Sequence, residues 1–139
     1  MDVDQDQGSI AIEAAILVPA ILLFLLLIIA AGRLETTRGV VDAAARDAAR
    51  SASLARTEAG ATTAAEDSAA ATLDQEGVAC QGQQAVGVDY QPGTQDQAGS
   101  VKVTVVCAVP LGDLAVPGLP GSKTITSSFT SVLDLYRAS

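Results

Sequence analysis

The chain has 139 residues, enough for one small domain or for a membrane segment joined to one. Its 16 acidic and 8 basic side chains give a net charge of -8, which argues against nucleic acid and anionic lipid headgroups as partners. Histidine, the commonest general base and metal ligand, is absent, and two cysteines alone cannot build a structural zinc site. The composition argues against most enzyme classes, so we expect no catalytic, cofactor or metal site and no small-molecule substrate.

The first predicted element is an apolar helix that can cross a membrane. Residues 14–31 carry no charge, and the stretch from Ile10 to Gly32 contains 23 residues, or about 34 Å of helix. A bilayer core about 30 Å thick matches this length. Pro19 lies near the first turns, where it can bend the helix without breaking it. A buried core helix is the alternative, but no other part of the chain is large enough to cover it on all sides.

A cleavable secretory signal is a second alternative. Residues 30–32 are small enough to suit a signal peptidase. The apolar run, however, exceeds the usual signal core of about 7–15 residues. Residues 1–7 also contain three aspartates and no basic residue. These features favour a permanent membrane span.

Glu13 is a charged residue near the start of this helix. An ionised carboxylate at the bilayer centre costs about 2.5–3.5 kcal/mol, and less near an interface. Glu13 can reach water, or a cation can neutralise it. Cleavage after Gly8 would create such a cation, the α-amino group of Ser9, four residues before Glu13 on the same helix face.

Residues 8–58 resemble the TadE/TadG family of pilus-assembly proteins, which belongs to the tight-adherence (Flp) secretion system and whose members resemble type IV prepilins. The features that carry the resemblance are the Gly8-Ser9 pair, Glu13, the Val18-Pro19 step, the Gly32-Arg33 exit and the alanine-rich segment 43–52 with its spaced arginines. The resemblance implies that a prepilin peptidase cuts between Gly8 and Ser9, which makes Glu13 the fifth residue of the processed chain and the partner of the new amine. It also implies that pilin-like or TadE-like subunits and an inner-membrane platform are partners, in addition to membrane lipid.

Two signals conflict over the orientation of the span. Four arginines follow it, and the positive-inside rule would place them in the cytoplasm: Arg33, Arg38, Arg46 and Arg50. Two cysteines in the C-terminal part point instead to an oxidising compartment. From the cysteines and the resemblance, we predict a cytoplasmic N-terminus and an extracytoplasmic C-terminal domain at the bacterial inner membrane.

Beyond the span, the helix is predicted to continue over residues 33–58. At 100° per residue, one stripe contains Leu34, Val41, Ala44, Ala45, Ala48, Ala52 and Ala55, and the opposite face contains Glu35, Asp42, Arg46, Arg50 and Ser53. The stripe can pack on the chain's own strands, as in pilin-like folds, or it can dock other subunits. Gly60 interrupts the pattern, so a second helix is expected within residues 59–77, from about Thr62 to Gln75, with Gly77 as its cap.

Residues 78–139 are predicted to form a small antiparallel three-stranded sheet. Alternation is clearest in Ser100–Pro110, and Val86, Val88 and Tyr90 also alternate before the hairpin loop Gln91–Gly99. Leu111–Lys123 indicates a connecting loop. Thr124–Tyr136 is the expected third strand, with Ile125, Phe129, Leu133 and Leu135 on one face.

Cys80 and Cys107 lie 27 positions apart. If they are paired, the chain-entropy estimate gives about 3.5 kcal/mol of stabilisation. Two independent buried thiols are the alternative. The absence of CxxC spacing argues against a redox-active pair.

The sequence therefore predicts an α+β, pilin-like fold with a leader (1–8), a transmembrane helix (9–32), its continuation (33–58), a second helix (59–77) and a small sheet domain (78–139). Two functional classes follow. The Gly8-Ser9 step and Glu13 favour a non-enzymatic pilus-assembly component, a pseudopilin or minor pilin. The acidic residues 1–7 instead favour a single-pass membrane anchor that carries an extracellular binding module outside any pilus assembly.

Overall fold

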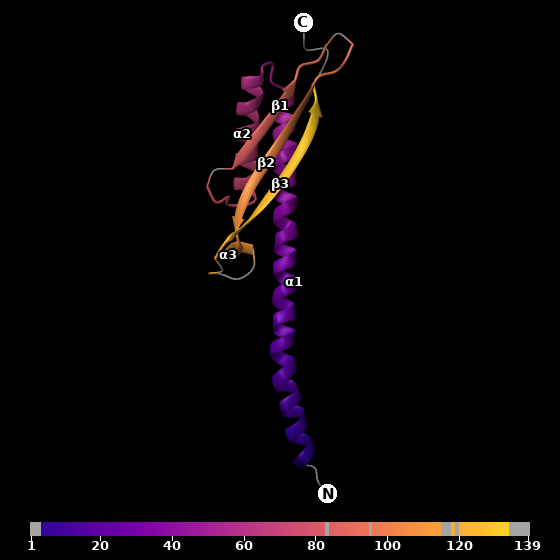
Figure 1. Cartoon of the computed structure of the whole chain (residues 1–139), viewed down its shortest axis with the longest axis vertical. Coiled ribbons are helices and arrows are strands. Elements are labelled where there is room, and N and C mark those ends of the chain that lie inside the picture. Colours follow the sequence, from indigo (N-terminus) through magenta and orange to yellow (C-terminus); the bar gives the residue numbers. More distant parts are fainter. Residues whose placement is uncertain (1–3, 83, 95, 115–117, 119, 134–139) are drawn as a thin grey trace.

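The computed structural model describes the backbone of residues 4–82, 84–94, 96–114, 118 and 120–133, and side chains from residue 11 onward. In chain order, the elements are α1 (Asp4–Ser53), α2 (Glu58–Gln75), β1 (Ala85–Gln91), β2 (Ser100–Pro110), α3 (Leu111–Leu114) and β3 (Ser122–Val132). Helix α1 extends far beyond the rest of the molecule, and only its C-terminal half contacts the other elements (Figure 1). The predicted α+β class, with a long apolar helix and a small antiparallel sheet, is confirmed.

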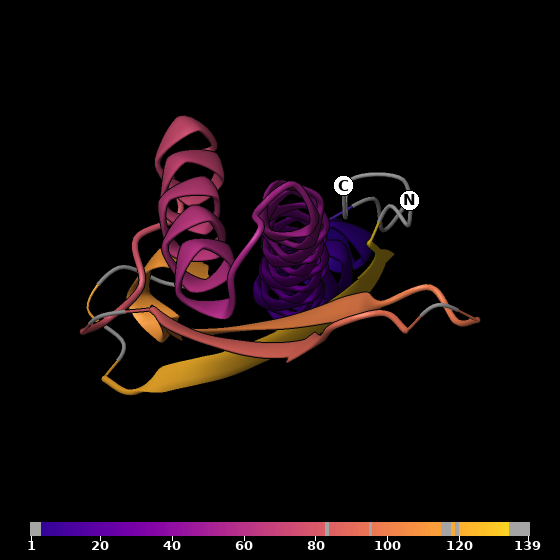
Figure 2. The same ribbon diagram turned by 90° about the horizontal axis from the view of Figure 1, so that it is seen from above.

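The three strands form one antiparallel sheet in the order β1-β2-β3. Tyr90 of β1 lies opposite Val101 of β2, and Cys107 of β2 lies opposite Ile125 of β3. Helices α1 and α2 both pack on one face of this sheet and leave the other face uncovered (Figure 2). The result is a two-layer domain at the C-terminal end of α1.

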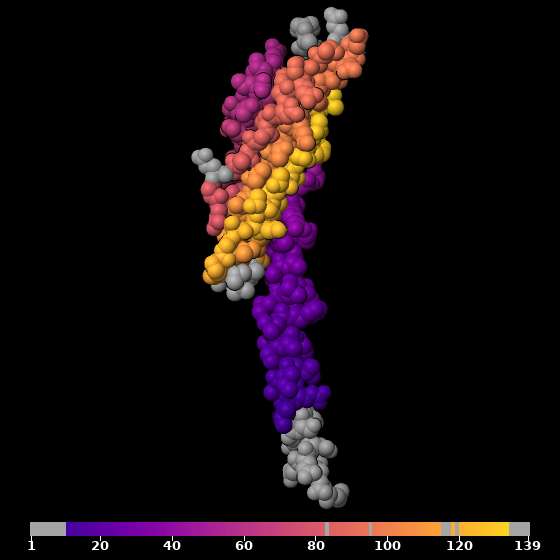
Figure 3. Space-filling model, viewed as in Figure 1, coloured from indigo at the N-terminus to yellow at the C-terminus, as the bar shows by residue number. Residues whose placement is uncertain are grey.

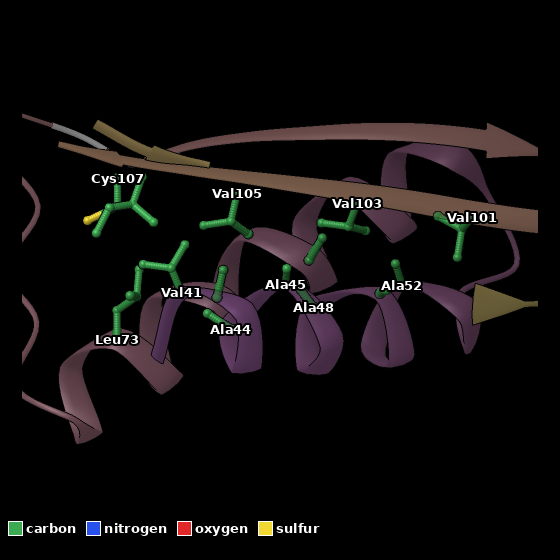
Figure 4. Close-up of a cluster of buried hydrophobic side chains, with 14 of the residues drawn as sticks. Val41, Ala44, Ala45, Ala48, Ala52, Leu73, Val101, Val103, Val105 and Cys107 are labelled. Carbon is green, nitrogen blue, oxygen red and sulfur yellow. The ribbon is translucent and has the colours of Figure 1, made fainter. Parts of the chain in front are cut away.

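The core lies between α1 and the central strand. Alternate residues of β2 from Val101 to Val109 are buried and face the helices, whereas Lys102 on the other face is exposed. Their side chains meet the alanines of α1 (Figure 4). Because alanine adds a single methyl group, the helix backbone can approach the sheet closely.

The stripe predicted on the continuation of the first helix is the face that packs on the chain's own strands. Five of its members, from Val41 to Ala52, are fully buried, and Leu34 and Ala55 lie at the margin of the core. Of the two uses considered for the stripe, the structure places it in the intramolecular core. Asp42, which was expected on the opposite face, is instead half-buried beside β3.

Helix α2 begins four residues before the start predicted from Gly60. Thr57 is its N-cap, and its side-chain hydroxyl accepts a hydrogen bond from the Gly60 N–H at 3.1 Å. Gly60 is thus the third residue of the helix and does not interrupt it. The break between the helices lies at residues 54–57, so α1 also ends before the predicted residue 58.

The other end of α2 follows the expected pattern. Gly77 has a φ of +68°, a conformation that favours glycine. Its N–H bonds to the carbonyl of Asp74 at 3.1 Å, and the Val78 N–H bonds to the carbonyl of Leu73 at 2.9 Å. This pair of bonds is a Schellman motif, which satisfies the last carbonyls of the helix.

Three details of the C-terminal part differ from the predictions. The segment expected to be a loop, Leu111–Lys123, contains the short helix α3, and its last two residues already belong to β3. The third strand ends at Val132, and residues 134–136 of the predicted strand lie outside the described part of the chain. Phe129 shares the face of Val103 but is 43% exposed, because β3 is an edge strand.

Candidate functional site

The N-terminal half of α1 is the largest uncovered apolar surface of the described chain. Every large apolar side chain from Ile12 to Ile29 is 49–69% exposed. This segment stands clear of the domain (Figure 3). It is long and apolar enough to cross a membrane, and none of its apolar window is buried in the protein. Such a surface requires lipid or other apolar helices around it.

Helix α1 is continuous through this segment. Pro19 lies inside the helix, and the helical backbone extends on both sides of it. Neighbouring groups can compensate for the missing proline N–H in apolar helices. The apolar half and the packed half therefore form one rod of 50 residues.

The predicted processing residues lie on this rod. Gly8 and Ser9 are within the helical backbone, and the side chain of Ser9 lies outside the described set. Glu13 is exposed on the same helix, four residues after Ser9. Residues separated by four positions are neighbours on a helix surface. The geometry therefore brings Ser9 and Glu13 to one side of the rod.

Three arginines that follow the apolar segment form polar contacts near the domain. The Arg33 guanidinium (Nη1) donates to the backbone carbonyl of Asp113 at 3.3 Å, which ties α1 to α3. Arg38 pairs with Glu35 at 2.6 Å, and Arg46 pairs with Asp42, one helical turn apart in each case. All three arginines are exposed, so each pair adds little stability by itself.

An open groove of about 590 Å³ lies between α1 and β3. One wall is formed by Glu35, Arg38, Gly39 and Asp42, and the other by residues 123–127. Ser127 donates a hydrogen bond to Asp42, which lines the opposite wall of this groove, at 2.8 Å. The pKa of Asp42 lies below its usual value of 3.8, mainly because of this bond from Ser127. The hydrogen bond from Arg46 is the second cause. Asp42 therefore stays ionised at neutral pH.

Cys80 and Cys107 form a disulfide bond, with their Cα atoms 5.2 Å apart. Cys107 is fully buried on β2, and Cys80 lies in the segment before β1. Next to the bridge, the Gln81 N–H donates to the Ala108 carbonyl at 2.6 Å. The bridge and this bond attach the segment between α2 and β1 to the central strand.

Sequence reasoning found the apolar helix, Glu13 and the two cysteines, but it did not find the groove. The groove depends on two elements about 85 residues apart, Asp42 on α1 and Ser127 on β3. The clustering of serine and threonine in residues 124–131 was a signal for a polar strand, but it did not indicate which element the strand would meet. In the described residues, no three carboxylate or cysteine side chains converge as metal ligands would.

Comparison with known proteins gives one result. The family described as TadE-like protein matches residues 8–50. The match begins at the Gly8-Ser9 pair and covers both the uncovered half of α1 and most of its packed half. No curated protein and no solved structure matches the chain significantly.

Proposed function

Because residues 8–50 form a TadE-like segment, we propose that the chain is a non-enzymatic pseudopilin or minor-pilin component of a tight-adherence (Flp) pilus or secretion assembly. Its apolar helix is stored in the bacterial inner membrane. Other pilin-like or TadE-like subunits and an inner-membrane platform are its partners. During assembly, helices of neighbouring subunits replace lipid around the rod.

The observation that carries this proposal is the fully uncovered apolar half of α1, which lies within the TadE-like match. Large apolar side chains lie on every side of this half, from Ile12 to Ile29, and not on one stripe. A helix that is apolar all round needs apolar surroundings on all sides. Lipid supplies them in the membrane, and a bundle of like helices supplies them in an assembly.

Glu13 gives the rod a polar group that selects partners. In the proposed mechanism, a prepilin peptidase cleaves between Gly8 and Ser9, and the new ammonium group of Ser9 pairs with Glu13 of its own chain or of a neighbour. An ion pair in a low-dielectric medium is much stronger than in water, and an unpaired carboxylate there is costly. Pairing with a neighbour would therefore favour helix packing at one register.

The disulfide supports an extracytoplasmic position for the sheet domain. Bonds such as Cys80–Cys107 persist in oxidising compartments and are rare in the cytoplasm. We therefore propose a cytoplasmic N-terminus, one span and a C-terminal domain outside the inner membrane. Of the arginines that then lie on the outer side, Arg38 and Arg46 form ion pairs with Glu35 and Asp42, and Arg33 contacts α3.

The first test is N-terminal sequencing of the protein recovered from native membranes. The proposal expects a chain that begins at Ser9. Recovery of a chain that still carries residues 1–8 contradicts the processing step. A chain that begins after residue 31 shows that the apolar segment is a discarded signal and overturns the proposal.

The second test replaces Glu13 with glutamine, which keeps the shape and removes the charge. We expect Glu13→Gln to abolish co-purification with pilus subunits from cross-linked membranes while the amount of membrane-bound protein stays unchanged. Glu58→Gln, an equivalent change at the exposed start of α2, is the matched control and should have no effect. If Glu13→Gln also has none, a membrane-anchored binding module explains the protein better.

A further inference from the structure

The end of the domain that contains α3 lies beside the point where the apolar half of α1 stops. The uncharged run of α1 ends at Gly32, and Arg33 is the first charged residue after it. The Arg33 guanidinium donates to the Asp113 carbonyl of α3 at 3.3 Å. Figure 1 shows α3 at the end of the domain nearest the N-terminal half of α1. The domain therefore begins where the apolar segment ends, without an exposed stretch of helix between them.

Two distances along the chain place the start of β3 at the same level. The hydrogen bond from Ser127 to Asp42 fixes β3 and α1 side by side. From Asp42 back to Arg33, α1 covers about 14 Å. From Ser127 back to Lys123, β3 covers about 13 Å. Because β3 starts next to α3 and runs along α1 from there (Figure 1), Lys123 lies near the level of Arg33.

The α3 end of the domain, defined as α3 together with residues 120–123, is an exposed surface that is well attached to the fold. The Leu111 N–H donates to the Gly121 carbonyl at 3.0 Å, which joins the start of α3 to the residue before β3. Leu114 is buried, and Leu111 packs against the core. Residues 120–123 are all exposed. Core packing and a backbone hydrogen bond therefore hold this surface beside the end of the apolar segment.

Three cations and two carboxylates lie at or just beyond the level of the α3 end. Arg33, Arg38 and Lys123 are exposed, as are Glu35 and Asp113. Arg38 pairs with Glu35 at 2.6 Å, whereas the printed partner of Arg33 is an uncharged backbone carbonyl. An arginine has five N–H donors and a lysine three, so Arg33 and Lys123 keep donors for other acceptors. Long basic side chains at the end of a membrane helix reach the phosphate level of the bilayer.

We infer that the α3 end of the domain is a membrane-contact surface that lies in the headgroup layer of zwitterionic phospholipids. Each headgroup layer is about 5–8 Å thick, and α3 contacts Arg33, the residue at which this layer begins. Arg33 and Lys123 then bind phosphate oxygens. The net charge of -8 disfavours a membrane rich in anionic lipid. The hairpin loop Gln91–Gly99, at the other end of the domain, points away from the membrane (Figure 1).

This inference rests on the proposed membrane anchoring by α1 and adds that the sheet domain itself contacts lipid. The test uses the absence of tryptophan from the chain. A single introduced tryptophan is then the only indole, and bromine atoms on nearby lipid chains quench its emission. The full chain is reconstituted in phosphatidylcholine vesicles that are unbrominated, brominated near the headgroup, or brominated near the ends of the acyl chains.

The tryptophan is introduced at one position in each variant. Pro120→Trp and Ser122→Trp place it on the α3 end, and the second repeats the measurement if the first does not fold. Thr126→Trp, on the uncovered face of the sheet, is the matched control, because it offers the same side chain at an exposed site of the same strand. Gln91→Trp places the probe at the far end of β1. Circular dichroism checks that each variant is folded.

We expect bromine near the headgroup to reduce the emission of Pro120→Trp and Ser122→Trp roughly twofold, and bromine near the chain ends to reduce it less. The emission of Thr126→Trp and Gln91→Trp should stay unchanged. If folded α3-end variants are quenched no more than Gln91→Trp, this surface stands clear of the lipid and the inference is wrong. Stronger quenching of Thr126→Trp than of the α3-end variants also overturns it, because the domain then lies on its sheet face.

Leu22→Trp, near the middle of the apolar segment, separates failure of the inference from failure of the proposed function. Suppose that bromine near the chain ends quenches Leu22→Trp, but no bromine quenches the α3-end variants. Helix α1 then spans the bilayer, the proposed anchoring stands, and the inference alone is wrong. If Leu22→Trp is not quenched either, the anchoring by α1 fails, and the proposed function fails with it.

Discussion

The side chain of Ser127 in β3 donates a 2.8 Å hydrogen bond to Asp42 in α1, between residues 85 positions apart. Arg46, one turn along α1, binds the other carboxylate oxygen of Asp42. Asp42 is thus held by the edge strand and by its own helix. This arrangement fixes how β3 sits against the rod and where the groove between them begins.

The first prediction concerns the pH dependence of stability. Because the folded pKa of Asp42 is lowered, its stabilising contribution is fully present above the unfolded value, near 3.8, and is lost as the pH falls through the lowered pKa. We expect Ser127→Ala to raise the pKa of Asp42 toward its usual value, since the main cause of the shift is removed. The Ser127→Ala chain should then lose less stability than the unmodified chain when the pH falls below about 4.

The measurement is carbon NMR titration of the Asp42 carboxyl, combined with thermal unfolding between pH 3 and 7. Ser128→Ala, on the uncovered face of the sheet, is the matched control. An Asp42 that titrates identically in the Ser127→Ala and unmodified chains would show that the hydrogen bond is not made in solution.

The second prediction concerns the close packing of α1 on the sheet. Ala48 is fully buried between α1 and β2, so Ala48→Leu must push the two apart. We expect it to lower the free energy of unfolding by about 1–3 kcal/mol. Ala71→Leu, on the exposed side of α2, should change it by less than about 0.5 kcal/mol. Denaturation of detergent-solubilised protein followed by circular dichroism measures both, and equal effects of the two would contradict the packing.

The third prediction concerns the disulfide. Replacing both Cys80 and Cys107 with alanine removes a bridge across 27 positions, and we expect a loss of about 3.5 kcal/mol in the free energy of unfolding. The unmodified chain in reductant should lose a similar amount, which controls for the change of side chain at buried Cys107. The thiols of the reduced protein are titrated to show that reduction is complete. If this protein unfolds at the same temperature as the oxidised protein, the disulfide does not stabilise the fold.

The fourth prediction concerns the start of α2. Thr57→Ala leaves the Gly60 N–H without its side-chain acceptor, and we expect a loss of about 1 kcal/mol. Thr63→Ala, an exposed position within the same helix, is the matched control and should have a smaller effect. Hydrogen exchange of the first turn of α2 gives a local readout. Protection of that turn should fall in Thr57→Ala and stay unchanged in Thr63→Ala.

Much of the fold could be predicted because its elements carry strong periodic patterns. The strand over Ser100–Pro110 was found with both ends correct, since a buried face alternates with a more polar one along its whole length. The long helix was found because charge is absent from residues 14–31. Gly77 was placed correctly as a cap because its position required a positive φ.

The features that were missed depend on single contacts. Gly60 suggested a helix break by its low helix propensity, but the capping hydroxyl of Thr57 starts the helix before it. The short helix α3 lies in a segment whose prolines and glycines indicated a loop. Asp42 was assigned to the face opposite the stripe by its angular position on the helix, and its contact with Ser127 of the distant strand β3 was not foreseen. Periodicity does not predict such pairings between distant elements.

No loop separates the apolar half of α1 from the half that packs on the sheet. A helix without a hinge transmits rotation about its axis from one end to the other. The angular position of the rod among its neighbours therefore also decides which side of the sheet domain each neighbour meets. Substitutions among the apolar residues can thus reorient the distant domain while leaving its own packing intact.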